Sequence, residues 1–214
     1  MDAFMAIDFD CYPPKWCHEY PYEADTQDPN VSKQVLYQDL LLGLFDKNFE
    51  SVDLKSDYFK KLNRLNEVNV PEDLEYLFDY YKTIISILYD KCDLGIRITE
   101  AYKKKDSGKM KELIEEIEKV KNKIAILKEQ MYNVWHKEHK AFGWEISDLR
   151  LSATIGRLDT VMLKLNNFAE NTDIKIEELS EERLLFGPAT VKDGKSLVPA
   201  LRYPWISTPS LNIR

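Results

Sequence analysis

The sequence predicts an all-α fold, an antiparallel helical bundle with a small C-terminal β-hairpin and an extended tail. From residue 31 onward, apolar residues recur every three or four positions, which is the spacing of one buried helix face. Only seven glycines occur in 214 residues, which disfavours a barrel or sandwich with many tight turns. A hydrophobic share of 44% beside 31% charged residues is ordinary for a soluble globular chain. We therefore expect a helical bundle domain over 31–185, preceded by a strap over 1–30 and followed by a hairpin and proline-rich tail over 186–214 that packs on the bundle.

The opening 30 residues differ in composition from the rest of the chain. They carry seven acidic residues and one lysine, which accounts for nearly all of the net charge of −7. They also contain six aromatic residues and no glycine. This composition is typical of an acidic, aromatic linker strap that lies on another surface. We expect it to be either poorly ordered or docked through Phe4, Phe9, Tyr12 and Trp16 onto the bundle or a neighbouring chain. The negative charge also argues against a nucleic acid as partner.

Three helices are expected before residue 103. The first covers "SKQVLYQDLLLGLFDKNFE" (32–50), with one apolar face. The second covers "SDYFKKLNRLNE" (56–67), with Ser56 as its N-cap. The third starts at Pro71, which two acidic residues follow, and continues as one long helix to Tyr102. Its apolar stripe advances by threes and fours through Leu74, Leu77, Phe78, Tyr81, Ile85, Leu88, Cys92, Ile96, Thr99 and Tyr102.

Two longer helices are expected in the second half. The first is capped by Asp106 or Ser107 and carries an apolar seam of period 3.5, the signature of an antiparallel helical hairpin or bundle. The seam consists of Met110, Leu113, Ile117, Val120, Ile124, Leu127, Met131 and Val134. The second runs from about Glu145 to Asn171 and carries two apolar stripes. Because two stripes require two packing partners, we expect this helix to be the central one.

The chain closes with shorter elements. A brief helix is expected over "IEELSEER" (176–183). After Phe186-Gly187-Pro188, "ATVKDGKSLV" (189–198) holds two extended runs around Asp193-Gly194, a strong hairpin signal. Three prolines then stiffen a tail that carries Trp205.

The stretch "WHKEHKAFGWEISDLR" (135–150) is close in spelling to a zinc-protease motif. That motif needs His-Glu-x-x-His, which places two imidazoles one helical turn apart with a glutamate beside the metal-bound water. Here His136 and His139 are only three apart, Glu138 is misplaced, and two lysines flank them. We interpret the stretch as the polar end of a helix, followed by a turn in which Gly143 takes a left-handed conformation.

Other candidate metal sites are weaker. Cys11, Cys17 and His18 resemble half of a zinc site, but no second pair exists in the sequence. With Cys92 they make three cysteines, which cannot form a closed disulfide framework and so indicate a reducing compartment. No signal peptide and no apolar run of membrane-spanning length is found, so we expect a cytoplasmic chain without a membrane partner.

The acidic motifs do not form an active site by themselves. Asp8-Phe9-Asp10 resembles the metal-binding Asp-x-Asp of some sugar transferases, but three residues carry little information. Adjacent glutamates, as at 115–116, 177–178 and 181–182, point about 100° apart on a helix and make poor acid/base pairs. Neither a glycine-rich phosphate loop nor a nucleophile motif is present. We therefore expect no catalytic, cofactor-binding or metal-binding residue in this chain.

Two stretches, 30–46 and 140–168, resemble the C-terminal helical domain of one branch of bacterial glycoside hydrolase family 20, whose members are β-N-acetylhexosaminidases. The resemblance rests on Leu36-Tyr37, Asp39, Leu41 to Asp46, Phe142 to Glu145, Asp148, Arg150 and Arg157, and on a tail with Arg202-x-x-Trp205 and Thr208-Pro209. It implies that an Asp-Glu pair in a preceding TIM barrel, absent from these residues, hydrolyses terminal N-acetylglucosamine or N-acetylgalactosamine from glycans. No catalytic residue can then be carried over to this chain.

The resemblance implies an accessory role, a non-catalytic domain that packs against the catalytic barrel of the same enzyme. The alternative is a free-standing helical module whose groove binds another protein. A metal-dependent hydrolase that uses His136 and His139 is a third, weaker hypothesis. Assembly into a homo-oligomer is left open.

Charged residues inside the two family-like stretches predict a contact between them. Asp39 and Asp46 are seven residues apart, as are Arg150 and Arg157, and all four lie among apolar neighbours. A charge in such surroundings is costly unless it meets an opposite charge. We expect at least one Arg–Asp ion pair, Asp39 with Arg157 and Asp46 with Arg150 if the helices are antiparallel, or the reverse pairing if they are parallel. Alternatively, both arginines face solvent or the barrel.

Overall fold

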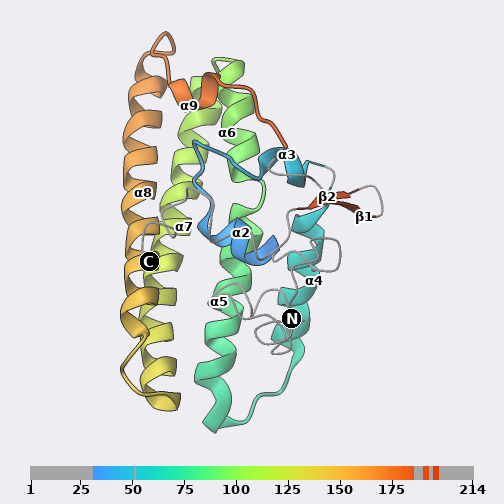
Figure 1. The fold of residues 1–214 in the computed structure, drawn as a ribbon, viewed down its shortest axis with the longest axis vertical. Coiled ribbons are helices and arrows are strands. Elements are labelled where there is room, and N and C mark those ends of the chain that lie inside the picture. The colour runs from blue at the N-terminus through green and yellow to red at the C-terminus, as the bar shows by residue number, and fades with distance from the viewer. Residues whose placement is uncertain (1–30, 51, 186–189, 193–194, 198–214) are drawn as a thin grey trace.

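The computed structural model describes residues 31–50, 52–185, 190–192 and 195–197, and these residues form a helical bundle (Figure 1). The helices are α2 (Val31–Tyr37), α3 (Asp46–Phe49), α4 (Leu54–Glu67), the 3-10 helix η3 (Glu72–Leu74), α5 (Glu75–Lys91), α6 (Leu94–Lys103), α7 (Ser107–Glu138), α8 (Trp144–Glu170) and α9 (Glu177–Ser180). Two short strands, β1 (Thr190–Lys192) and β2 (Lys195–Leu197), pair antiparallel. The predicted helical bundle is confirmed.

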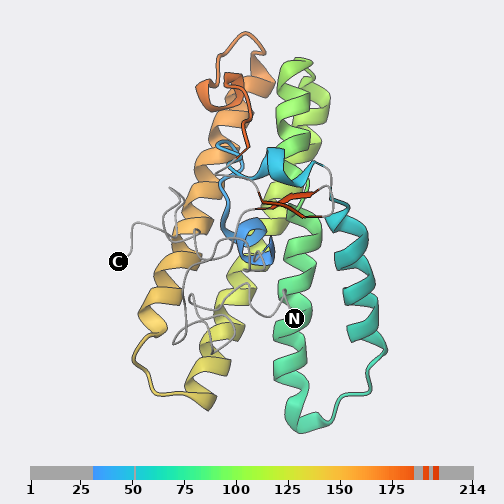
Figure 2. The same cartoon turned by 45° about the vertical axis from the view of Figure 1, so that its right-hand side comes forward.

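Helix α7 is the centre of the bundle. It packs against α8 on one side and against α5 and α6 on the other, while α4 packs against α5 (Figures 1 and 2). The prediction that α8 is central was wrong. One of its apolar stripes is buried against α7, but its outward side lies at the edge of the bundle, where Leu149 and Leu163 are exposed.

The seam of α7 forms as the sequence predicts. The Asp106 carboxylate accepts the backbone N–H of Lys109 at 2.9 Å and so caps the first turn of the helix. All seam residues from Met110 to Met131 are buried, and Val134 is partly buried. Burial of one side chain per half turn along 32 residues provides the main apolar contact between α7 and its neighbours.

The predicted long helix over 71–102 is divided in two. Helix α5 ends at Lys91 and α6 begins at Leu94, with Cys92 and Asp93 between them. The Asp93 carboxylate binds Lys55 of α4 and Arg97 of α6. At the break, Gly95 lies so close to the Asp46 carboxylate that an added Cβ would be 2.9 Å from Oδ2. The apolar stripe continues across the break, which is why its periodicity gave no sign of it.

The predicted helix over 32–50 is also interrupted. Helix α2 ends at Tyr37, residues 38–45 form a compact turn, and only four residues of α3 follow. Three long-range side chains, described below, hold this turn and compete successfully with helix propensity. The turn brings buried charges together and forms the candidate site.

Two local predictions about helix ends have different outcomes. Gly143 has φ +95° before α8, so its left-handed conformation is confirmed. The prediction of Ser56 as the N-cap of α4 was wrong. Asp53 caps this helix by accepting the Ser56 backbone N–H at 3.1 Å, and the helix begins two residues before Ser56, at Leu54.

Several predictions lie outside the described residues. These are the strap over 1–30 with its aromatic contacts, the motifs that contain Asp8, Asp10, Cys11, Cys17 and His18, the turn at 193–194 and the tail from 198. The hairpin as a whole and its packing therefore remain predictions. Within the described part of the chain, no helix combines the length and apolar character that crossing a membrane requires.

Candidate functional site

Buried charged side chains gather around the turn 38–45, which we call the α2–α3 turn. It lies between α8 and α6, in front of α7 (Figures 1 and 2). Asp39 and Asp46 come from the turn and the start of α3, Lys91 from the end of α5, and Arg183 from the segment after α9. Because these groups are taken out of water together, their contacts determine both the shape of the turn and its chemistry.

Side chains within the turn replace the backbone bonds of a helix. The Asp39 carboxylate accepts the backbone N–H groups of Leu41 and Leu42 at 2.9 and 3.0 Å, a local pattern that favours turns over helix. The Gln38 side-chain oxygen accepts the N–H of Phe45 at 3.1 Å. Gly43 has φ +51°, which is inexpensive only for glycine.

Lys91 satisfies the carbonyl groups at the end of α2. Its Nζ donates to the backbone oxygens of Val35, Leu36 and Gln38 at 2.8, 2.7 and 2.8 Å. An ammonium group has three N–H donors, so these three acceptors use all of them. Burial lowers the pKa of Lys91 to about 7, while Asp39 and Asp46 act in the opposite direction.

Arg183 holds the other half of the turn. Its Nη1 and Nη2 atoms donate to the carbonyl oxygens of Leu42 and Leu41, each at 2.6 Å. Nη1 also donates to the carbonyl of Glu178 at 3.1 Å, on α9. The guanidinium therefore ties the α2–α3 turn to a segment more than 140 residues away in sequence.

Asp46 lies at the centre of the cluster and is 3% exposed. It accepts a hydrogen bond from the Gln38 amide at 2.9 Å, and its Oδ2 is 3.7 Å from Nε of Arg183. Burial raises the pKa of Asp46 to about 6, against the lowering effects of Arg183 and Gln38. Two glycines make room for this carboxylate, since a Cβ on Gly43 would be 2.2 Å from Oδ2 and one on Gly95 2.9 Å.

One of the two predicted Arg–Asp ion pairs is present. Arg157 Nε lies 2.7 Å from Asp39 Oδ2, so α8 is joined to the α2–α3 turn. The predicted pair of Asp46 with Arg150 does not form, because Asp46 lies beside Arg183 instead. The prediction assumed a continuous helix from Asp39 to Asp46, and the turn directs Asp46 away from α8. Arg150 is buried near Tyr37, whose pKa burial raises to about 12.

The chemistry available to this cluster is limited by its enclosure. A carboxyl group and an amine with pKa values moved toward neutrality are typical of catalytic acids and bases. Here, however, Asp46 and Lys91 are both buried, and the protons of Lys91 are directed at backbone carbonyls. The geometry therefore indicates a structural clamp that holds the turn.

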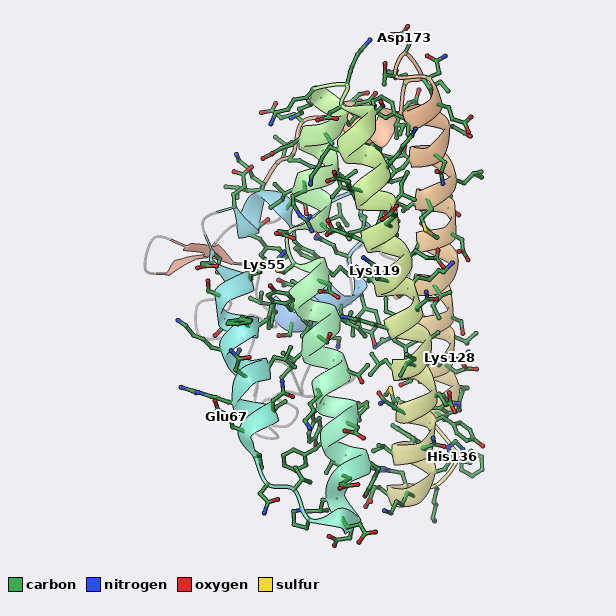
Figure 3. The ribbon with its side chains drawn as sticks, turned by 180° about the vertical axis from the view of Figure 1, so that it is seen from behind. Lys55, Glu67, Lys119, Lys128, His136 and Asp173 are labelled. Atoms are coloured by element: carbon green, nitrogen blue, oxygen red, sulfur yellow. The ribbon has the colours of Figure 1, made fainter. Side chains whose placement is uncertain are left out.

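The two histidines of the opening motif do not converge. The His136 ring packs on Tyr132 with centroids 4.0 Å apart, whereas His139 stacks on Trp135 at 5.0 Å. Figure 3 shows His136 near the lower end of the bundle, on α7. Within the part of the chain that the structure describes, no group of three or more His, Cys, Asp or Glu side chains could hold a metal ion.

Sequence reasoning identified Asp39, Asp46 and Arg157 but missed Lys91 and Arg183. A signal for Lys91 did exist, because it follows Ile84, Ile87 and Leu88 at helical spacing and so occupies a buried position. Arg183 follows two glutamates in a polar segment, and no local pattern distinguishes it from an ordinary surface residue.

Comparison with known proteins gives one family. The family model described as Glycoside Hydrolase 20C C-terminal domain matches residues 2–198. None of the curated proteins matches the chain.

Proposed function

The chain belongs to the Glycoside Hydrolase 20C C-terminal domain family, and we propose that it is the non-catalytic helical domain of a β-N-acetylhexosaminidase. In this proposal, the domain packs against a catalytic barrel that removes terminal N-acetylglucosamine or N-acetylgalactosamine from glycans. The observation that carries the proposal is the family match, because it extends over nearly all of the chain.

The α2–α3 turn supports a non-catalytic role. Its two groups with pKa values near neutrality, Asp46 and Lys91, are enclosed and hold backbone, so neither presents a proton to a substrate. His136 and His139 stack on separate aromatic rings. The most reactive side-chain types among the described residues thus have structural contacts that account for their positions.

The proposed setting is a bacterial, cytoplasmic enzyme. The odd number of cysteines supports a reducing compartment. Cys92 is a free thiol, buried, and burial raises its pKa to about 12. A thiol of that kind behaves as a small apolar side chain and not as a nucleophile.

The proposal is tested by assaying the purified chain and the assembled enzyme, in which chain and barrel are present together, on a chromogenic N-acetylglucosaminide. The assembled enzyme should release chromophore, and the chain alone should not exceed the buffer control. Turnover by the chain that persists through further purification would contradict a non-catalytic domain. A folded chain that makes no contact with the barrel would instead favour a free-standing helical interaction module.

A further inference from the structure

The outward side of α8 is an apolar helix face. Leu149 is 51% exposed and Leu163 is 62% exposed, and no described helix covers this side of the bundle (Figures 1 and 2). The two leucines are fourteen residues apart, close to four helical turns, so they lie on nearly the same line along α8, separated by about 21 Å. We call the line from Leu149 to Leu163 the α8 outer face.

Small residues make the middle of the α8 outer face flat. Ala153, Gly156 and Thr160 lie between the two leucines at helical spacing. A Cβ added at Gly156 would meet no atom within 4 Å, so the surface there is open. A glycine in a helix interior costs about 1 kcal/mol relative to alanine, and this cost is offset where another element must approach closely.

Burying the α8 outer face would leave few charges without partners. Asp159, which lies toward its edge, is paired with Lys121 of α7 at 3.0 Å. Lys164, on the opposite edge, is paired with Glu178 of α9. Since both charges already have partners within the domain, covering the leucines between them would require little additional desolvation.

The exposed side of α7 has a different character. Its outward residues are mainly charged, as the run that includes Lys111, Glu115 and Lys119 illustrates, and Figure 3 shows Lys119 and Lys128 on this helix. Ile126 is an isolated exposed apolar residue on α7, at 52%. Single exposed apolar side chains are normal on soluble surfaces, whereas aligned ones mark contacts.

We propose that the α8 outer face is the surface on which the catalytic barrel of the same enzyme docks. This rests on the proposed function, which provides the occupant. The family description places the domain C-terminal in its enzyme, so the polypeptide comes from the barrel into the bundle through α2. Directly after α2, Asp39 is ion-paired to Arg157 near the middle of α8. A barrel tethered before α2 is therefore held beside α8, next to its apolar face.

The first test is hydroxyl-radical footprinting of the 214-residue chain alone and in the assembled enzyme. Oxidation of Leu149 and Leu163 should fall at least about fivefold on assembly, as expected for side chains at the centre of an interface. Ile126 has the same exposure as Leu149 and serves as the internal control, with unchanged oxidation. Protection of Ile126 without protection of the two leucines would overturn the inference while leaving the proposed function intact.

The second test uses variants of the assembled enzyme. In L149E/L163E, two buried charges should release the barrel, so that trypsin cleaves the segment before α2 at least about tenfold faster. The matched variant I126E should be cleaved at the rate of the unmodified enzyme. Equal rates for all three proteins would refute the proposed surface. Melting curves of the variant chains establish that they fold, which is expected because all three positions are exposed.

The tests also separate this surface from other occupants. If the leucines become protected in the chain alone as its concentration rises, a second copy covers them and the inference is wrong. If assembly protects no described residue at all, the proposed packing on a barrel fails, and with it the premise of this inference.

Discussion

The α7–α8 seam and the α2–α3 turn belong to one bundle but are held by different forces. Along the seam, apolar side chains such as Ile117, Ile124 and Leu127 are fully buried against neighbouring helices. In the turn, the backbone is held by side chains that come from distant elements. Lys91 acts over 53 to 56 residues, Arg157 over 118, and Arg183 over 141 to 142.

This difference affects how each region tolerates change. The seam gains its stability from apolar area, so a smaller apolar residue removes only a part of it. The turn has few alternatives, because removing one charged partner leaves several buried polar groups unsatisfied at once. We therefore expect the polar clamp to be the more sensitive region, although it has fewer residues.

The largest effect should come from Lys91→Met. Methionine fills a similar volume but leaves the carbonyls of Val35, Leu36 and Gln38 without their donor. We expect the free energy of unfolding to fall by about 4 kcal/mol, measured by urea denaturation. The control K119M, at an exposed position of α7, should change it by less than about 0.5 kcal/mol. Similar losses in both variants would remove the distinction between the two regions.

In the seam, Leu127→Ala should cost about 3 kcal/mol, because it leaves a cavity beside α7. Its neighbour in sequence, Ile126, provides a matched comparison, since Leu127 is 0% exposed and Ile126 is 52% exposed. I126A should cost less than about 0.5 kcal/mol in the same denaturation assay. A smaller loss for L127A than for I126A would mean that the seam is not the apolar core of the bundle.

Two glycine-to-alanine changes should have opposite signs. At Gly43, φ is +51° and the new Cβ would lie 2.2 Å from Asp46 Oδ2, so G43A should destabilise the chain by about 2 kcal/mol. At Gly156, the helix is regular and the space is open, so G156A should stabilise it by about 0.5 kcal/mol. Thermal unfolding of both variants checks the pair. A melting temperature raised by G43A would show that the turn does not need the left-handed residue.

The smallest predicted effect concerns pH. The pKa of Asp46 is about 6 in the folded chain and 3.8 as its ordinary value, so the folded chain holds this proton more tightly. The stabilisation is present at low pH and is lost as the pH rises through the folded pKa. From about pH 6.5 to about 4.5, the free energy of unfolding of the wild-type chain should therefore rise by about 1 kcal/mol relative to D46N. A fall over the same range would show that the folded chain favours the ionised carboxylate.

The regions also differ in how far their sequence predicts them. The seam from Met110 to Val134 and the left-handed Gly143 follow local rules, because periodicity and turn chemistry act within a few residues. The α2–α3 turn does not, since the apolar pattern of 32–50 continues through it and Arg183, which holds it, lies far along the chain. The Asp39–Arg157 pair was predicted from the cost of burying charges, although the assumed helix was wrong. Asp46 was paired with the wrong arginine for that same reason.

The central claim is that the ionisable groups of this domain hold its structure and do no chemistry. Asp46 is the strictest case, because its pKa of about 6 would suit a general acid. The most direct measurement is kcat of the assembled enzyme on a chromogenic N-acetylglucosaminide with and without D46N, below the melting temperature of both. A structural carboxylate predicts kcat values that agree within about twofold, whereas a loss of about a hundredfold or more would identify Asp46 as catalytic and contradict the claim.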